Sequence, residues 1–323
     1  MCGRVTACFT FAVCAMYAQQ KPEFEVASVR PAAALDQAKI AAAMDKGGKW
    51  PIGASVDARR AVYTYMDLRS LMALAWGVRP YQIEGPDWIA STRFDIIATL
   101  PAGATKKDAP RMLQSLLEER FGLVAHRTTA EHPVLALVVG KGGLKLKPSA
   151  GTPEPIDENT PLKPGEFKLD GIDGQIRITL NRTDNSSVMN YGAEGILRRK
   201  DNPVTRSLHL EFSMTSMSGL ADMLTQIFTQ LAGGIGRQIV DMTGIQGHYD
   251  AILDVSLSDM AAMAKPAGPD VPAAPAPAVP GDPAFTAPPL MEAIQKLGLK
   301  LESRTAPVEQ LVVDHVEKTP TGN

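Results

Sequence analysis

The sequence predicts an α+β protein built from a tandem duplication, with two helices packed on small sheets in each domain. Two observations lead to this prediction. The phrase GLVAHRTTAEHPVLALVV at 122–139 is nearly repeated, with one gap, as GLKLESRTAPVEQLVV at 298–313. A helical pattern precedes each copy, and further matching segments lie upstream in the same order. A repeat of this kind indicates a duplicated structural unit, here strand–helix–strand–strand–helix–strand–strand.

The first residues, 1–18, have the layout of a secretory signal peptide. Arg4 precedes the apolar run Val5–Tyr17, and Ala18 stands before two polar glutamines, so we expect cleavage after Ala18. The apolar run is shorter than the roughly 20 residues that span a bilayer, which disfavours a membrane anchor. The mature chain is therefore expected to be periplasmic or secreted, with no transmembrane span.

All the cysteines lie inside this leader, at Cys2, Cys8 and Cys14. A cleaved chain would have no disulfide, thiol nucleophile or cysteine-ligated metal. The alternative is a lipoprotein that carries its lipid on Cys14, but the FAV before this cysteine lacks the expected small residue. The net charge of −2 over 323 residues gives no electrostatic reason to expect nucleic acid as a partner.

The first copy of the unit lies in a predicted first domain, 19–148. Alternating apolar residues predict a strand at 60–66, and residues 93–100 also have a strand pattern. Apolar residues at helical spacing predict amphipathic helices at 66–78 and 108–121.

The second copy lies in a predicted second domain, 174–323. It repeats the order of the first, with strands at 208–214 and 248–255 and helices at 217–234 and 287–297. The two copies differ mainly by an insertion in the second.

Segments outside the repeats complete the organisation. The polar stretch 149–173 is the expected linker between the domains, and the Pro/Ala-rich stretch 264–289 is expected to be a solvated loop. Strands at 24–31 and 174–183 would add an edge strand to each domain.

Four residues mark equivalent places in the two copies. Asp95 and Asp250 each follow an aromatic residue and begin an apolar run, whereas Gly122 and Gly298 each follow a helix. The glycines are expected to end the helices in the left-handed conformation.

The motifs FEVASVRP (24–31), QIEGPDWIASTRFDIIA (82–98) and VDMTGIQGHYDAILD (240–254) resemble the soil-associated uncharacterised protein family. The resemblance covers nearly the whole mature chain. It implies an exported domain of unknown function, expanded in soil acidobacteria, which some relatives carry fused to a membrane peptidase of the antibiotic-sensing antirepressor type. The family has no established activity.

A second resemblance concerns the layout of each half. The segments LADMLTQIF (220–228) and LMEAIQKLGLKLESR (290–304) are similar in outline to the short N-terminal domain of secretins and TonB-dependent receptors. That resemblance implies a periplasmic interaction or signalling module, and fold-level analogy assigns no further function.

The repeated aspartates have a structural and a catalytic interpretation. An aspartate at a strand start more often accepts a hydrogen bond from a backbone N–H or pairs with an arginine, and Arg127 and Arg304 are the candidate partners. Because a catalytic group is rarely needed once per repeat, we favour the structural role for Asp95 and Asp250.

The histidines of the repeated phrase suggest a metal pair only under one condition. His126 and His132, with Glu131 between them, would need a hairpin that brings both rings to one face. No third ligand stands at a motif spacing, so we assign no metal, cofactor or catalytic residue.

A candidate interaction surface consists of aromatic residues near a Gly-Pro turn and of polar residues in the phrase at 122–139 that are absent from its copy at 298–313. Aromatic residues gathered in this way are enriched in binding hot spots, although they would equally close the core of the first repeat. The residues of this candidate surface are Trp76, Tyr81, Trp88, His126, Arg127 and His132.

These observations favour an exported, non-enzymatic interaction or signalling module of the bacterial envelope, with an envelope or secreted protein as partner. The alternative is a hydrolase or a small-ligand-binding protein with its site in the groove between the repeats. A ligand site would require a deep pocket with convergent polar groups, whereas an interaction module would expose apolar or edge-strand surface.

Overall fold

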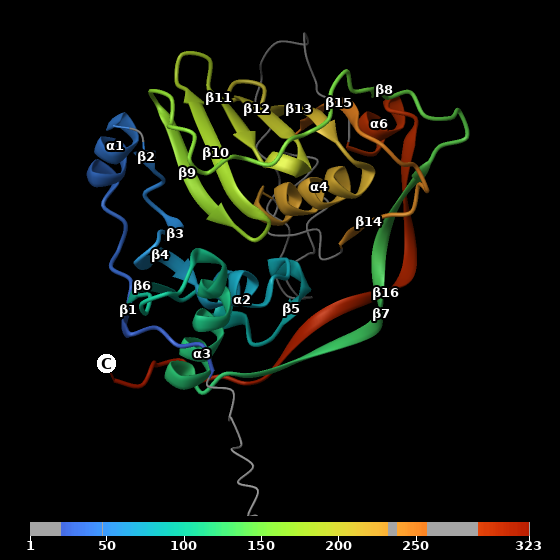
Figure 1. Ribbon diagram of the computed structural model, residues 1–323. Helices are drawn as coiled ribbons and strands as arrows, with labels where there is room; N and C mark the ends of the chain where they lie inside the picture. Colours follow the sequence, from blue (N-terminus) through green and yellow to red (C-terminus); the bar gives the residue numbers. More distant parts are fainter. Residues whose placement is uncertain (1–20, 47, 232–237, 257–289, 323) are drawn as a thin grey trace, which may run out of the picture.

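The computed structural model describes residues 21–46, 48–231, 238–256 and 290–322. Its largest element is a sheet of twelve strands (Figure 1). The short strand β2 (Gly48–Lys49) pairs with β9 off the main path. The other strands are antiparallel neighbours in the order β1 (Val26–Pro31), β6 (Arg93–Thr99), β4 (Arg60–Asp67), β3 (Gly53–Val56), β9 (Glu166–Gly171), β10 (Gly174–Asn181), β11 (Ser186–Asn190), β12 (Ile196–Asn202), β13 (Ser207–Thr215), β15 (Tyr249–Ser256) and β8 (Lys147–Pro148).

A second sheet of four strands is built around two long ones. Its order is β14 (Ile239–Asp241), β7 (Val124–Val139), β16 (Leu299–His315) and β5 (Ile83–Glu84). Strands β7 and β16 pair antiparallel along almost their whole length, and together they run along one side of the molecule (Figure 1). Strands β14 and β5 add short parallel pairings on the outer edges.

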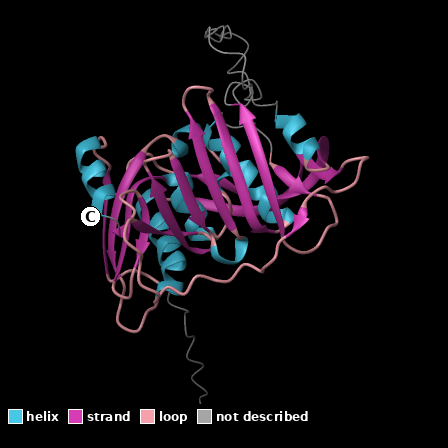
Figure 2. Cartoon of the chain, turned by 90° about the horizontal axis from the view of Figure 1, so that it is seen from above, coloured by secondary structure: helices cyan, strands magenta, loops and turns pink. Residues whose placement is uncertain are grey.

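Most of the helices lie on one face of the large sheet (Figure 2). The α-helices of the described residues are α1 (Gln37–Lys46), α2 (Leu68–Trp76), α3 (Ala109–Phe121), α4 (Met217–Leu231) and α6 (Leu290–Lys296). Short 3-10 helices are η1 (Pro80–Gln82), η2 (Asp87–Ala90), η3 (Lys106–Asp108) and η4 (Gly192–Glu194).

Local sequence explains where helices α2 and α3 begin and end. The Asp67 carboxylate caps α2 by accepting a hydrogen bond from the Ser70 backbone N–H at 2.8 Å. Gly77, with φ 64°, ends α2, and Gly122, with φ 56°, ends α3 in the left-handed conformation that glycine adopts without strain. Gly298 has φ 77° just after α6.

The molecule has two main hydrophobic cores, and each long strand contributes to both halves. The first core contains α2, α3, β4 and β6 together with Leu311 from β16. The second contains α4, α6, β13 and β15 together with Leu137 from β7. Strand β7 follows the helices of the first core and β16 those of the second. Each half therefore completes its core with a strand from the other half.

The predicted fold class, two tandem domains with helices packed on separate small sheets, is wrong. The structure has one large antiparallel sheet that joins both halves, because β9, β10, β11 and β12 connect the strands of the first half to those of the second. Strand β9 lies within 149–173, the segment expected to be a linker. The domain boundaries at 19–148 and 174–323 remain a prediction.

The last two strands predicted for each repeat unit are instead one continuous strand, β7 in the first half and β16 in the second. Pro133 and Pro307 lie inside the continuous strands β7 and β16, opposite Thr305 and Glu131. A proline interrupts a strand only where its missing N–H would have bonded to a neighbour, so it is tolerated at an edge. The two phrases therefore pair with each other instead of folding back on themselves.

Two predicted segments, the leader 1–18 and the loop 264–289, lie outside the described residues. Among the residues that the structure describes, no helix has the length and apolar character needed to cross a membrane.

Candidate functional site

A cavity of about 510 Å³ lies between α2, α4 and the turn that joins β9 to β10. Helix α2 and the residues just after it contribute one wall, and helix α4 contributes another. The turn at 171–174 and parts of β3, β4, β6, β9 and β10 also line it, as do Tyr191 and Glu194 between β11 and β12. The site is thus made where elements of the two halves meet.

The helix periodicity explains why both helices have a face toward the cavity. On α2, Ser70, Ala73 and Leu74 line the cavity, while the opposite face is buried in the first core. On α4, the lining residues follow a spacing of three or four: Gly219, Asp222, Met223, Gln226 and Thr229. Residues three and four apart share one side of an α-helix, so each helix serves a core and the cavity together.

Arg79 ties three elements together at one end of the cavity. Its guanidinium forms an ion pair with Asp173 in the β9–β10 turn. It also donates from Nη2 and Nε to Oδ2 of Asp222 on α4, at 3.1 and 3.3 Å. The Tyr81 hydroxyl donates to the other oxygen, Oδ1, of Asp222 at 2.9 Å. The loop after α2 is therefore fastened to the second half by a charged network.

Burial and charge set the protonation of this network. Burial alone would lower the pKa of Arg79, but Asp173 and Asp222 outweigh it and raise that pKa. Burial, followed by the charge of Asp222, raises the pKa of Tyr81 well above its ordinary value. Arg79 is thus a fixed cation and Tyr81 a neutral hydrogen-bond donor at neutral pH.

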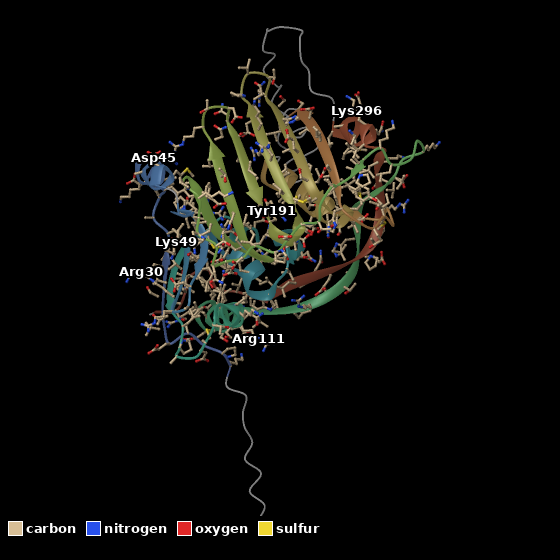
Figure 3. All side chains as sticks on the ribbon, turned by 45° about the horizontal axis from the view of Figure 1, so that its top comes forward. Arg30, Asp45, Lys49, Arg111, Tyr191 and Lys296 are labelled. Carbon is tan, nitrogen blue, oxygen red and sulfur yellow. The ribbon has the colours of Figure 1, made fainter. Side chains whose placement is uncertain are left out.

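The remaining lining is largely apolar. Tyr191, labelled near the centre of the view in Figure 3, donates from its hydroxyl to Sδ of Met189 at 3.4 Å, and burial raises its pKa. Leu74, Met223 and Ile172 supply aliphatic and thioether surface from three different elements. Ligand pockets of about 300–1,000 Å³ with apolar walls and a few polar groups are the usual form of small-molecule sites.

The residues of the predicted interaction surface are not brought to one place. Tyr81 lines the cavity, whereas Trp76 and Trp88 pack against the first core. Arg127 is exposed on β7, where it pairs with Glu309 of β16 and donates to the Trp76 carbonyl at 2.5 Å.

The histidines of the repeated phrase lie along one strand. His126 is hydrogen-bonded through Nδ1 to Asp314 at 2.7 Å, and His132 lies opposite Ala306. Within the described part of the chain, no three histidine, cysteine, aspartate or glutamate side chains are grouped to hold a metal ion.

Asp95 and Asp250 make the same backbone contact in the two halves. Asp95 accepts from the Tyr65 N–H at 2.7 Å, and Asp250 accepts from the Met214 N–H at 3.0 Å. Tyr65 and Met214 both have φ 54° and lie where the register of β4 and β13 shifts. Each carboxylate thus satisfies the N–H of a residue in an otherwise unfavourable left-handed conformation.

The arginine partners expected for these aspartates are wrong. Arg127 pairs with Glu309, and Arg304 pairs with Glu302 at 2.6 Å. Arg127 therefore binds a carboxylate of the neighbouring strand β16, whereas Arg304 binds one two residues before it on its own strand.

A separate charged group lies on β13 and β15. His209 is hydrogen-bonded through Nδ1 to Asp254 at 2.6 Å and through Nε2 to Glu211 at 3.1 Å. Glu211 also pairs with Arg198 at 3.3 Å. Partial burial lowers the pKa of His209, but the two carboxylates outweigh this effect and raise it.

A family model described as "Protein of unknown function (DUF3738)" matches residues 69–316. The chain belongs to this family. Neither a curated protein nor a solved structure matches it. The region shared with the DUF3738 family contains Arg79, Asp173 and Asp222, and so includes the network at the end of the cavity.

Sequence reasoning missed most of the cavity in this DUF3738 member. It identified Tyr81 but not Arg79, Asp173 or Asp222. Asp222 carried a usable signal, because it is the one charged residue in the segment that forms α4. Asp173 carried none, since an aspartate in a polar turn is ordinary.

Proposed function

We propose that this chain is an exported, non-enzymatic module that binds a small molecule in the cavity between its two halves. The observation that carries the proposal is the cavity itself, about 510 Å³ in volume, with apolar walls and a few inward polar groups. A ligand there would contact α2, α4 and the β9–β10 turn together, which suits a signalling role because binding would stabilise their present arrangement.

We favour binding over hydrolysis because the hydroxyl groups of the cavity lining at Ser70 and Tyr81 are already engaged with carboxylates. The Ser70 hydroxyl donates to Asp67, which caps α2, at 2.9 Å. Tyr81 donates to Asp222, and the raised pKa of Tyr81 makes it a poor base or nucleophile at neutral pH. These contacts hold α2, α4 and the loop after α2 in place, and they leave the apolar space of the cavity free for a ligand.

A fluorescence assay with N-phenylnaphthylamine, an apolar dye, tests the proposal. Gln226 on α4 lines the cavity and is half-buried, so Gln226→Trp should fill part of the space. Ser218 on the same helix is exposed and outside the lining, so Ser218→Trp is the matched control. We expect saturable binding to the wild type and the control, and at least about ten-fold weaker binding to Gln226→Trp.

Circular dichroism melting of both variants establishes that they are folded. Equal dye affinity in the two variants, or no saturable binding to the wild type, would contradict the proposal.

The location of the module is part of the proposal. The leader pattern at 1–18 and the resemblance to the soil-associated exported family both favour a periplasmic or secreted protein, and the outline shared with the secretin short domain favours an envelope protein as partner. Mass spectrometry of the chain expressed with its leader in a Gram-negative host tests this point. A periplasmic product beginning at Gln19 is expected, whereas an uncleaved chain or a lipid adduct on Cys14 would refute it.

A further inference from the structure

Most of the charged side chains that line the cavity already have partners. Arg79 is paired with Asp173 and Asp222, and Arg93 is paired with Asp67. Asp170 is paired with Lys106, which lies outside the lining, at 2.5 Å. These groups need no ligand to balance them.

Arg69 on α2 is different. Its side chain lines the cavity, and its Nε is buried without a hydrogen-bond partner. Among the described residues, no carboxylate pairs with it. Its terminal nitrogens form no hydrogen bond with a described residue and are not fully buried, so a bound carboxylate would give this guanidinium its missing partner.

Two acceptors in the same cavity also lack partners. Gln175, at the start of β10, is 8% exposed, and its Oε1 is buried without a hydrogen bond. Glu194, at the end of η4, is half-buried and forms no ion pair with a described residue. Its carboxylate lies over the first turn of α4, where a Cβ on Gly219 would be 3.4 Å from Oε2.

From this arrangement we propose that the ligand is a zwitterion, an apolar amino acid or a short apolar peptide. This inference rests on the proposed function. The ligand's carboxylate binds the Arg69 guanidinium, and its ammonium group binds the Glu194 carboxylate. Arg69 and Glu194 line the same cavity from different halves and form no ion pair with each other, so the two ends of one ligand supply the missing partner for each.

The walls fit the rest of such a molecule. Leu74, Ile172, Met223 and the rings of Tyr81 and Tyr191 offer apolar surface to aliphatic or aromatic side chains. Apolar burial would supply most of the affinity, while the two charged ends would set orientation and select against molecules that lack one of them.

Isothermal titration calorimetry with matched ligands tests the inference on the wild-type chain. Leucine, Leu-Leu and Leu-Leu-Leu probe the span between the charged groups. For the best of the three, the N-acetyl form lacks the ammonium charge and the C-terminal amide lacks the carboxylate. We expect each blocked form to bind at least about ten-fold weaker, because one cavity charge is then left unpaired.

Two variants test which cavity residue binds each charged end of the ligand. In Arg69→Met the acid and the amide should bind equally, and in Glu194→Gln the free and acetylated amino ends should bind equally. Arg127→Met, which breaks an exposed ion pair outside the cavity lining, is the control and should change neither ratio. An Arg69→Met variant that retains the full preference for the acid would refute the assignment.

The outcomes also separate this inference from the proposed function. If N-phenylnaphthylamine binds the cavity but none of the three free ligands does, or if the blocked forms bind as well as the free ones, the zwitterion is wrong and the binding function stands. If neither the dye nor the three ligands bind, both are wrong.

Discussion

Replacement of Arg79 by methionine should destabilise the protein markedly, because Arg79 joins the two halves through Asp173 and Asp222. Methionine keeps an apolar chain in place of the arginine stem and removes only the guanidinium. The Arg79 side chain is 18% exposed, whereas the carboxylates of Asp222 and Asp173 are 32% and 48% exposed.

The size of the effect follows from these exposures. Breaking a fully buried ion pair costs about 3–5 kcal/mol, because the remaining charge is left without a partner. An exposed pair contributes about 0.2–1 kcal/mol. Since Arg79 is largely buried but its carboxylates can regain water, we expect a loss of about 1.5–3 kcal/mol.

Urea unfolding followed by circular dichroism measures the free energy of unfolding of the chain without residues 1–18. Arg127→Met is the matched control, because Arg127 and Glu309 are 48% and 49% exposed. We expect it to cost less than about 1 kcal/mol. A double-mutant cycle with Asp222→Asn should give a coupling energy of about 1 kcal/mol or more. Equal losses in Arg79→Met and Arg127→Met, or additive effects in the cycle, would refute the reasoning.

Three further predictions follow from the fold. Asp95→Ala should cost about 1–3 kcal/mol by leaving the left-handed Tyr65 without its N–H acceptor. Asp250→Ala should cost less, because its contact is exposed and Ser149 Oγ also accepts from the Met214 N–H at 3.2 Å; no loss in urea unfolding of Asp95→Ala would contradict this. The raised pKa of His209 stabilises the fold below its unfolded pKa, near 6.5, and this contribution is lost as pH rises through the folded value. His209→Gln should therefore be less stable than the wild type at about pH 6, by under about 1 kcal/mol, and the gap should close by about pH 9; a gap independent of pH would count against it. Leu137 and Leu311 are fully buried, so Leu137→Ala and Leu311→Ala should each lower the free energy of unfolding by about 2–5 kcal/mol. Because the halves exchange long strands, tryptophan fluorescence and circular dichroism should report one shared unfolding transition in each variant. Different unfolding midpoints from the two probes would show that the halves unfold independently.

The sequence by itself determined the local elements and their buried faces. Helices α2 and α3 were predicted at 66–78 and 108–121, close to their observed bounds, because apolar residues at helical spacing mark a face that must be buried. The strands at 60–66 and 208–214 also lie where the alternation of apolar residues placed them. Such patterns are local, so they can be read without knowing what covers them.

Only the tertiary structure decided which strands pair. The repeat predicted two short strands at the end of each unit, but β7 and β16 are continuous and pair with each other, and β9 to β12 join the halves into one sheet. Alternation shows that one face of a strand is buried, yet it does not name the partner, since register is fixed by contacts between residues far apart in the chain.

The cavity depends on the same long-range contacts. Arg79, Asp173 and Asp222 come from three separate segments, and no spacing in the sequence links them. These charged groups lose water only when the halves pack together, and each is then stabilised by an opposite charge from another segment. The sequence therefore determined the elements, and the pairing of the two halves created the site.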